Sequence, residues 1–169
     1  EEAVQAVGGA YLLFRTSWLY SLRRPCFVTK VLQWAREKET LRIVDDQIST
    51  PTWARILADN TTQLVAMEKS HLFEFIYNHS GLYHLSASGE CSRYEWALAI
   101  LEMDQKKEEH LVKQILPANS QDFPTSAKRP TRSTLSCGKF EKEFGFLLPH
   151  WLPVYRLAME YLNHCDPKK

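Results

Sequence analysis

Residues 11–20 read YLLFRTSWLY, an apolar run that ends in Arg15, Thr16, Ser17 and Trp18. The run predicts a buried strand that reaches the surface at a polar, aromatic pocket wall. Ligands of open α/β sheets bind outside the carboxyl ends of the strands. The stretch therefore predicts an α/β fold, and it places a candidate ligand site directly after this strand.

Strand and helix patterns alternate along the rest of the chain. The predicted elements are helices over 27–39, from about 52, after 92, over 139–144 and over 151–162, and strands at 41–44, 82–85 and 111–116. Ser92 and Glu95 have the spacing of a capping box, and Thr52 is a candidate N-cap. Residues 69–80 show no clean periodicity. The chain is long enough for one compact core, so we expect residues 1–169 to form a single unit.

The charge balance excludes a general attraction to polyanions. Lys and Arg total 21 against 20 Asp and Glu, which gives a net charge of +1. That balance offers no drive toward nucleic acid or a membrane surface, and no apolar run approaches the ~20 residues that a bilayer span needs. We therefore expect a cytoplasmic protein with neither nucleic-acid nor membrane partners.

The usual catalytic motifs are missing from these residues. The six glycines form neither GxGxxG nor a Walker loop, no Tyr is followed by Lys four residues later, and no HExxH or GxSxG occurs. The four cysteines, at 26, 91, 137 and 165, include no CxxC pair, which indicates reduced thiols. We assign no catalytic, cofactor-binding or metal-binding residue within this chain.

The beginning of the sequence points to a larger protein. Residue 1 is Glu rather than Met, and residues 1–7 have the pattern of the last turns of a helix. We expect the chain to be the second half of a longer polypeptide.

Five blocks carry a specific combined pattern. They are RTSWLY (15–20), LRIVDDQISTPTWARILAD (41–59), GLYHLSASGECSRYEWA (81–97), KRPTRSTL (128–135) and FGFLLPHW (144–151). In this order and spacing they closely resemble the carboxyl half of the dTDP-4-dehydrorhamnose reductase family. The resemblance covers nearly the whole chain.

The resemblance implies a fold and an activity. Members of that family are extended short-chain reductases, in which an amino-terminal Rossmann half binds NADPH or NADH and supplies Thr, Tyr and Lys for catalysis. It implies that this chain holds the last Rossmann strands and a small mixed α/β substrate-binding subdomain, and that the cofactor-binding half lies outside residues 1–169. The implied function is to bind the nucleotide sugar for reduction of dTDP-4-dehydro-L-rhamnose to dTDP-L-rhamnose, in dTDP-rhamnose biosynthesis.

Trp18 is the strongest candidate for substrate binding. It matches the tryptophan that contacts the deoxysugar in the family, and an indole face suits the apolar C–H and methyl side of such a ring. The alternative is a core tryptophan at the end of a strand. Ser17 is a weaker candidate, since it could simply turn the chain, and Arg15 could pair with an acidic residue of the sheet.

Two further segments offer polar candidates. Asp45, Asp46 and Gln47 end a strand where side chains can reach nucleotide hydroxyls, although a charged turn is the commoner explanation; we select Gln47. Arg129 and Arg132 lie in a long polar loop, and a guanidinium group can bind a diphosphate through two hydrogen bonds. A solvated basic loop is the alternative there, and we select Arg129.

Two other functions stay open. The chain could be a non-catalytic regulatory subunit with the same fold, as the β subunit of methionine adenosyltransferase is, or an independent binding module. The retained Trp18 argues against a pure scaffold. Family members can form homodimers, in some cases around Mg²⁺ held by glutamates, but the sequence places no such ligands.

Overall fold

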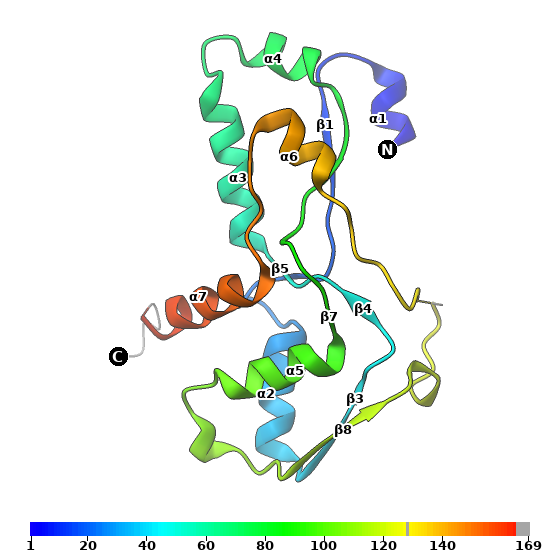
Figure 1. The fold of residues 1–169 in the computed structure, drawn as a ribbon, viewed down its shortest axis with the longest axis vertical. Coiled ribbons are helices and arrows are strands. Elements are labelled where there is room, and N and C mark those ends of the chain that lie inside the picture. The colour runs from blue at the N-terminus through cyan, green and yellow to red at the C-terminus, as the bar shows by residue number, and fades with distance from the viewer. Residues whose placement is uncertain (128, 165–169) are drawn as a thin grey trace.

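The computed structural model describes residues 1–127 and 129–164. Its elements are α1 (Glu2–Val7), β1 (Leu12–Arg15), β2 (Leu19–Tyr20), α2 (Phe27–Glu37), β3 (Thr40–Val44), β4 (Ile48–Ser49), β5 (Thr52–Trp53), α3 (Ala54–Met67), α4 (Leu72–Asn78), β6 (Gly81–His84), β7 (Cys91–Ser92), α5 (Arg93–Glu102), η1 (Lys107–Glu109), β8 (Gln114–Ala118), η2 (Ser120–Asp122), α6 (Gly138–Phe144) and α7 (Trp151–His164). Figure 1 shows an elongated molecule, with α3, α4, α6 and β1 in its upper part and α2, α5, β3 and β8 in its lower part.

The upper part is built on a two-stranded parallel sheet. β1 pairs with β6, in a register that places Leu12 beside Gly81 and Arg15 beside His84. One hydrophobic core packs here, formed by residues of α3, of β6 and the position directly after it, of α6 and of the segment after α6. These are Leu64, Tyr83, Leu85, Phe140, Phe144 and Leu148. Two parallel strands joined by a long connection that contains helices confirm the predicted α/β class.

The lower part packs helices against a second parallel pair, β3 and β8. On α2, Val28, Val31 and Ala35 recur at helical spacing and are fully buried. They belong to the larger hydrophobic core, which also contains Trp96 and Ile100 of α5. The apolar stripe of α2 therefore fixes its position against α5.

Two short strand pairs lie between the parts. β2 runs parallel to β5, with Leu19 beside Thr52 and Tyr20 beside Trp53. β4 runs antiparallel to β7, with Ser49 beside Cys91. The chain leaving β1 is thereby held against residues 48–53, near the middle of the molecule in Figure 1.

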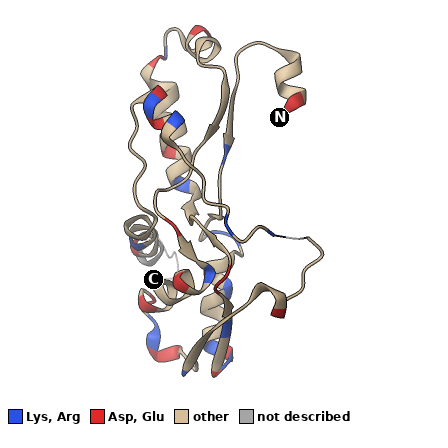
Figure 2. Cartoon of the chain, turned by 45° about the vertical axis from the view of Figure 1, so that its right-hand side comes forward, with Lys and Arg blue, Asp and Glu red and all other residues tan. Residues whose placement is uncertain are grey.

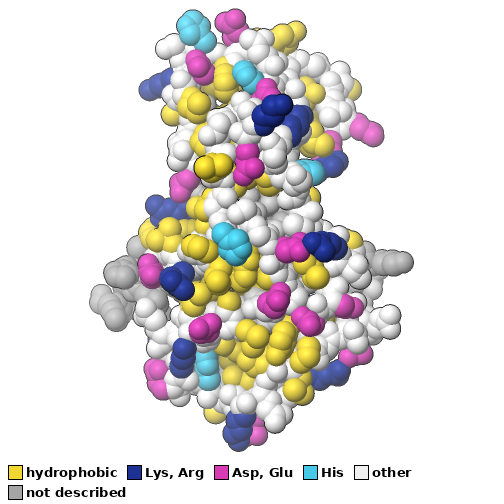
Figure 3. Space-filling view, in the orientation of Figure 1, with side chains coloured by type: hydrophobic (Ala, Val, Ile, Leu, Met, Phe, Trp, Pro, Cys, Tyr) yellow, Lys and Arg dark blue, Asp and Glu magenta, His cyan; other side chains and the backbone are white. Residues whose placement is uncertain are grey.

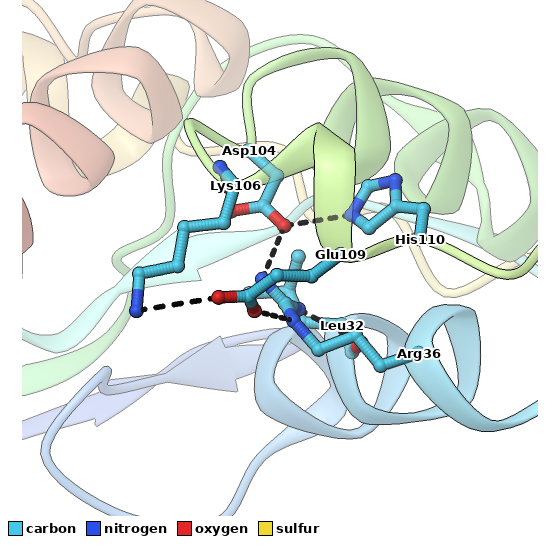
Figure 4. A network of polar contacts seen from close by, with 6 residues as sticks. All are labelled: Leu32, Arg36, Asp104, Lys106, Glu109 and His110. Carbon is cyan, nitrogen blue, oxygen red and sulfur yellow. Dashed lines mark hydrogen bonds and ion pairs between the residues drawn. The ribbon is translucent and has the colours of Figure 1, made fainter.

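A polar network fastens the end of α2 to the segment between α5 and β8 (Figure 4). The carboxylate of Asp104 accepts a hydrogen bond from Arg36 Nη2 at 2.7 Å, and its Oδ2 lies 2.7 Å from His110 Nε2. Arg36 Nε also donates to Glu109 at 2.7 Å. Asp104 is buried, so this network satisfies a charge that would otherwise be costly in the interior.

Local predictions from sequence have mixed outcomes. The capping box is confirmed, since Ser92 Oγ accepts from Glu95 N and the Glu95 carboxylate accepts from Ser92 N. The Thr52 cap is wrong: Trp53 is the N-cap residue of α3, and the Thr52 hydroxyl accepts from Ala87 N instead. The predicted strand at 111–116 lies at 114–118, and residues 69–80 contain α4.

The structure shows how the charged residues are distributed and which cysteines are free. Figure 2 shows basic and acidic residues interspersed along the ribbon. In the part of the chain that the structure describes, no helix is long and apolar enough to cross a membrane. Cys26, Cys91 and Cys137 are free thiols, and Cys165 lies outside the described residues.

Candidate functional site

Trp18 occupies a strained position at the exit of β1. Its φ is 34°, and it is the one non-glycine residue with positive φ in the described chain. A left-handed conformation costs a non-glycine residue roughly 1–2 kcal/mol. Such strain persists where surrounding contacts enforce it, and it concentrates at functional sites. Here the Trp18 carbonyl accepts a hydrogen bond from Thr52 N at 3.2 Å, which ties the turn to β5.

A pocket of about 300 Å³ opens beside this turn. Its lining residues come from the β1 exit, the end of β3 and the loop before α6: Thr16, Ser17, Trp18, Gln47, Arg129, Pro130, Ser133 and Leu135. All four residues selected from the sequence therefore line one cavity, although up to 112 positions separate them along the chain (129 minus 17). Their contacts with a ligand stay a prediction.

The two hydroxyls of the turn have different roles. Ser17 is buried, and its Oγ donates to the Thr50 carbonyl at 3.0 Å, so it anchors the turn to the β4–β5 segment. Thr16 Oγ1 is also buried but has no hydrogen-bond partner among the described residues. An unsatisfied buried hydroxyl costs about 1–3 kcal/mol. Because Thr16 lines the pocket, a polar ligand group there could satisfy it.

The two acidic residues after β3 accept hydrogen bonds from other parts of the chain. Asp45 Oδ1 accepts from Ser92 Oγ at 2.5 Å, and Asp46 accepts from both the amide and the hydroxyl of Ser120 at 2.9 and 2.8 Å. The charged-turn interpretation therefore describes both residues. Gln47 alone of this group lines the pocket.

The arginines considered from sequence also differ in whether they line the pocket. Arg129 lines the pocket, whereas Arg132 pairs with the Glu90 carboxylate at 2.5 Å. Arg15, the last residue of β1, pairs at 2.6 Å with Glu1, which lies outside the sheet, and both side chains are exposed to solvent. Of the three arginines considered from sequence, only Arg129 is directed to the pocket.

Sequence reasoning missed Arg93, the first residue of α5. Its guanidinium carbon lies 3.8 Å from the ring centroid of Trp18, 4.8 Å from that of Phe27 and 5.7 Å from that of Trp96. Burial, reinforced by the charge of Arg129, lowers the pKa of Arg93 to about 10, so it remains a cation at neutral pH. One signal was available: a cation in the first turn of a helix opposes the helix dipole.

A larger pocket of about 630 Å³ lies elsewhere, lined in part by Arg23, Trp53, Arg55 and Tyr161. There the guanidinium of Arg55 lies over the rings of Trp53 and Tyr161, and it pairs with Asp59 at 3.6 Å. None of the residues selected from sequence lines this pocket. We therefore take the smaller pocket beside Trp18 as the candidate site.

No metal centre is evident in the described chain, where no group of three or more His, Cys, Asp or Glu side chains could hold an ion. The glycines likewise offer no dinucleotide cradle. Gly8 and Gly9 adopt positive φ, but they belong to no GxGxxG pattern. That no residue of this chain contacts a nicotinamide cofactor stays a prediction.

Solved structures share this fold, among them two reductases. A dTDP-4-dehydrorhamnose reductase from Clostridium acetobutylicum matches with a TM-score of 0.75 and 28% identity, over 90% of this chain and 49% of its own. The dTDP-4-dehydrorhamnose reductase from Bacillus anthracis in complex with NADP matches with a TM-score of 0.75 and 27% identity, over 96% of this chain and 51% of its own. The chain therefore has the fold of one half of an extended short-chain reductase.

Sequence comparison identifies the family of this chain within that class. The family model described as RmlD substrate binding domain matches residues 1–163. The dTDP-4-dehydrorhamnose reductase of Escherichia coli K12 is 36% identical over 154 residues, 89% of this chain and 49% of that protein. That of Burkholderia thailandensis is 34% identical over 154 residues, 89% of this chain and 51% of that protein. The chain belongs to the RmlD substrate binding domain family, and it spans about half the length of the curated relatives it matches.

Proposed function

We propose that residues 1–169 are the substrate-binding half of an NADPH-dependent reductase that converts dTDP-4-dehydro-L-rhamnose to dTDP-L-rhamnose. The observation that carries the proposal is the convergence of Trp18, Ser17, Gln47 and Arg129 on one pocket, in a chain of this family. In this proposal the chain contributes binding and orientation. The catalytic groups and the dinucleotide-binding Rossmann half lie outside residues 1–169.

The pocket has the character that a deoxysugar needs. The indole of Trp18 offers an apolar face to the C–H and methyl side of the ring, and Gln47 and the unpartnered Thr16 hydroxyl offer hydrogen bonds to its polar side. A volume of about 300 Å³ is at the lower end for small-molecule sites. It suits part of a sugar nucleotide, with the remaining wall supplied from outside this chain.

Arg129 supplies a positive charge that complements the diphosphate of a sugar nucleotide. A guanidinium group binds phosphate oxygens through two parallel hydrogen bonds, which also fixes their orientation. We assign Arg129 to the diphosphate of the dTDP-sugar. Holding the sugar in a reactive geometry contributes several kcal/mol to catalysis, so this half would be needed for turnover even with an intact cofactor site.

The sheet supports the existence of a second half. In the described chain β1 pairs only with β6, yet parallel sheets in α/β proteins normally have more strands and are covered on both faces. The Bacillus anthracis relative was solved in complex with NADP. By analogy, NADPH is our proposed hydride donor, bound outside this chain, and we assign no residue here to it.

The proposal includes a cytoplasmic location and a homodimer. Figure 3 shows hydrophobic side chains gathered on one face of the lower part, and Leu98 of α5 and Leu157 of α7 are 39% and 52% exposed. Exposed apolar patches mark interaction surfaces. Size-exclusion chromatography with light scattering tests the dimer, and a monomer at micromolar concentration would contradict it.

The activity is tested with the full-length gene product. We expect oxidation of NADPH, followed by absorbance, when dTDP-4-dehydro-L-rhamnose is added, and no oxidation with dTDP-glucose, which has no keto group to reduce. Binding of dTDP without NADPH oxidation would show a non-catalytic relative and overturn the reductase proposal.

A further inference from the structure

Among the described residues, Arg93 is a cation without a counter-ion. In the described part of the chain no carboxylate lies within ion-pair distance of its guanidinium group, and its neighbours there are the rings of Trp18, Phe27 and Trp96. It is also the first residue of α5, where the helix dipole presents positive charge. Its position therefore costs the protein stability unless a ligand or an aromatic face compensates the charge.

The distances show which face of Trp18 it covers. Trp18 and Trp96 stack at 5.8 Å with 12° between their planes, and Arg93 lies 3.8 Å from Trp18 and 5.7 Å from Trp96. If Arg93 lay on the face of Trp18 opposite Trp96, its distance to Trp96 would be the longest of the three. It is not, so Arg93 and Trp96 share one side of Trp18. Neither lines the pocket, whereas Trp18 does.

Two cations therefore lie in the neighbourhood of the indole. Arg93 lies behind Trp18, and Arg129 lies in the pocket, where its charge acts on that of Arg93. The carboxylates of the neighbouring segments, Asp45, Glu90 and Glu95, already accept hydrogen bonds from Ser92 Oγ, from Arg132 and from Ser92 N, respectively. The surroundings of the pocket thus retain positive charge that an anionic ligand would neutralise.

We propose that Arg93 is a positioning and specificity residue: it holds the Trp18 indole from the face away from the ligand, and with Arg129 it makes the pocket select ligands that carry a diphosphate. The proposal rests on the function proposed above. A cation stacked on an indole fixes the ring by a cation–π contact. The left-handed backbone of Trp18 is held separately, by the hydrogen bond from Thr52 N to the Trp18 carbonyl.

The test uses three variants of the full-length gene product. R93Q removes the charge and the stack, R93K keeps the charge, and R156Q removes a charge from an exposed position of α7 that lines none of the three pockets. Affinities for dTDP and for thymidine are measured by calorimetry at low and high salt. Near-ultraviolet circular dichroism reports the stacked tryptophan pair without any ligand.

We expect R93Q to weaken dTDP binding by about tenfold, to change thymidine binding far less and to reduce the salt dependence. R93K should recover most of the preference for dTDP while the tryptophan signal stays altered, and R156Q should match the unmodified protein in both readouts. A merely structural Arg93 would lower affinity for both ligands equally, and that result would overturn the proposal.

The two proposals fail in different ways. If the unmodified protein binds no dTDP, the proposed function and the diphosphate selectivity are both wrong, while circular dichroism still decides whether Arg93 holds Trp18. If dTDP binds and R93Q leaves both the ligand preference and the tryptophan signal unchanged, only the role of Arg93 is wrong.

Discussion

The indole of Trp18 lies nearly parallel to that of Trp96, with their centroids 5.8 Å apart and 12° between their planes. Trp96 is buried in the core of the lower part, whereas Trp18 lines the pocket beside β1. The stack therefore connects the wall of the pocket to the buried core of the molecule. Stacked aromatic pairs contribute about 0.5–1.5 kcal/mol beyond their buried area.

Replacing Trp18 by alanine should impair function more than stability. W18A removes the apolar wall of the pocket, so we expect kcat/KM for the sugar nucleotide to fall roughly 10- to 100-fold in the full-length gene product. Steady-state NADPH oxidation measures the change.

The control for this variant is W34A, which truncates a half-buried tryptophan of α2 that lines none of the three pockets. It should lower the denaturation midpoint while leaving kcat/KM close to that of the unmodified protein. An unchanged kcat/KM in W18A would remove Trp18 from the site.

Gly89 should tolerate alanine less well than Gly145. Both have positive φ, 76° and 72°, but a Cβ at Gly89 would lie 2.2 Å from His150 Nε2, whereas nothing lies within 4 Å at Gly145. We expect G145A to cost about 1–2 kcal/mol of unfolding free energy from backbone strain alone, and G89A to cost about 1 kcal/mol more.

Urea denaturation of G89A, G145A and the double variant G89A/H150A separates the cost of backbone strain from the cost of the clash with the His150 ring. Removing the His150 ring should bring the cost of G89A close to that of G145A. Equal costs for the two single variants would mean that the ring moves aside freely.

Asp104 should stabilise the fold at neutral pH and cease to do so in acid. Burial alone raises the pKa of this carboxyl, but hydrogen bonds from His110 and the Lys106 amide, with the charge of Arg36, outweigh it and leave the pKa below its ordinary 3.8. The unfolded chain then binds the proton more readily than the folded one. The stabilisation is therefore complete above the ordinary value and is lost as pH falls through the folded pKa.

D104N should lower the unfolding free energy by about 2 kcal/mol at neutral pH. The difference between D104N and the unmodified protein should shrink as pH falls below about 4. D59N is the control, because Asp59 forms an exposed pair with Arg55 at 3.6 Å, and such pairs contribute little. A difference for D104N that does not depend on pH would contradict the charged role of Asp104.

Cys91 should be the slowest to react of the three described thiols. Burial, with the nearby Glu95 carboxylate, raises its pKa to about 12, so almost no thiolate exists at neutral pH. Cys26 and Cys137 are half-buried. Iodoacetamide labelling followed by mass spectrometry should show both modified before Cys91, and early labelling of Cys91 would contradict its burial in the native fold.

The features predicted correctly from sequence depend on short spacings. The Ser92–Glu95 capping box needs residues three apart, and the end of α6 at Gly145 needs one residue that tolerates positive φ. The prediction that Thr52 is the N-cap of α3 was wrong because the Thr52 hydroxyl accepts a hydrogen bond from a distant amide, Ala87 N, and Thr52 itself pairs within β5. A local rule cannot anticipate a partner 35 positions away.

The amino-acid sequence by itself indicated the α/β class through apolar periodicity between neighbouring positions. It indicated the family through five blocks in a fixed order, and it offered the four residues that line the pocket as candidates. Only the tertiary structure decided which polar groups the fold had already used: Ser17 bonds Thr50, Arg132 pairs with Glu90, and Asp45 binds Ser92. It also placed the guanidinium of Arg93 3.8 Å from the ring centroid of Trp18. Hydrogen bonds and ion pairs between distant segments depend on how those segments pack, and no local spacing encodes that packing.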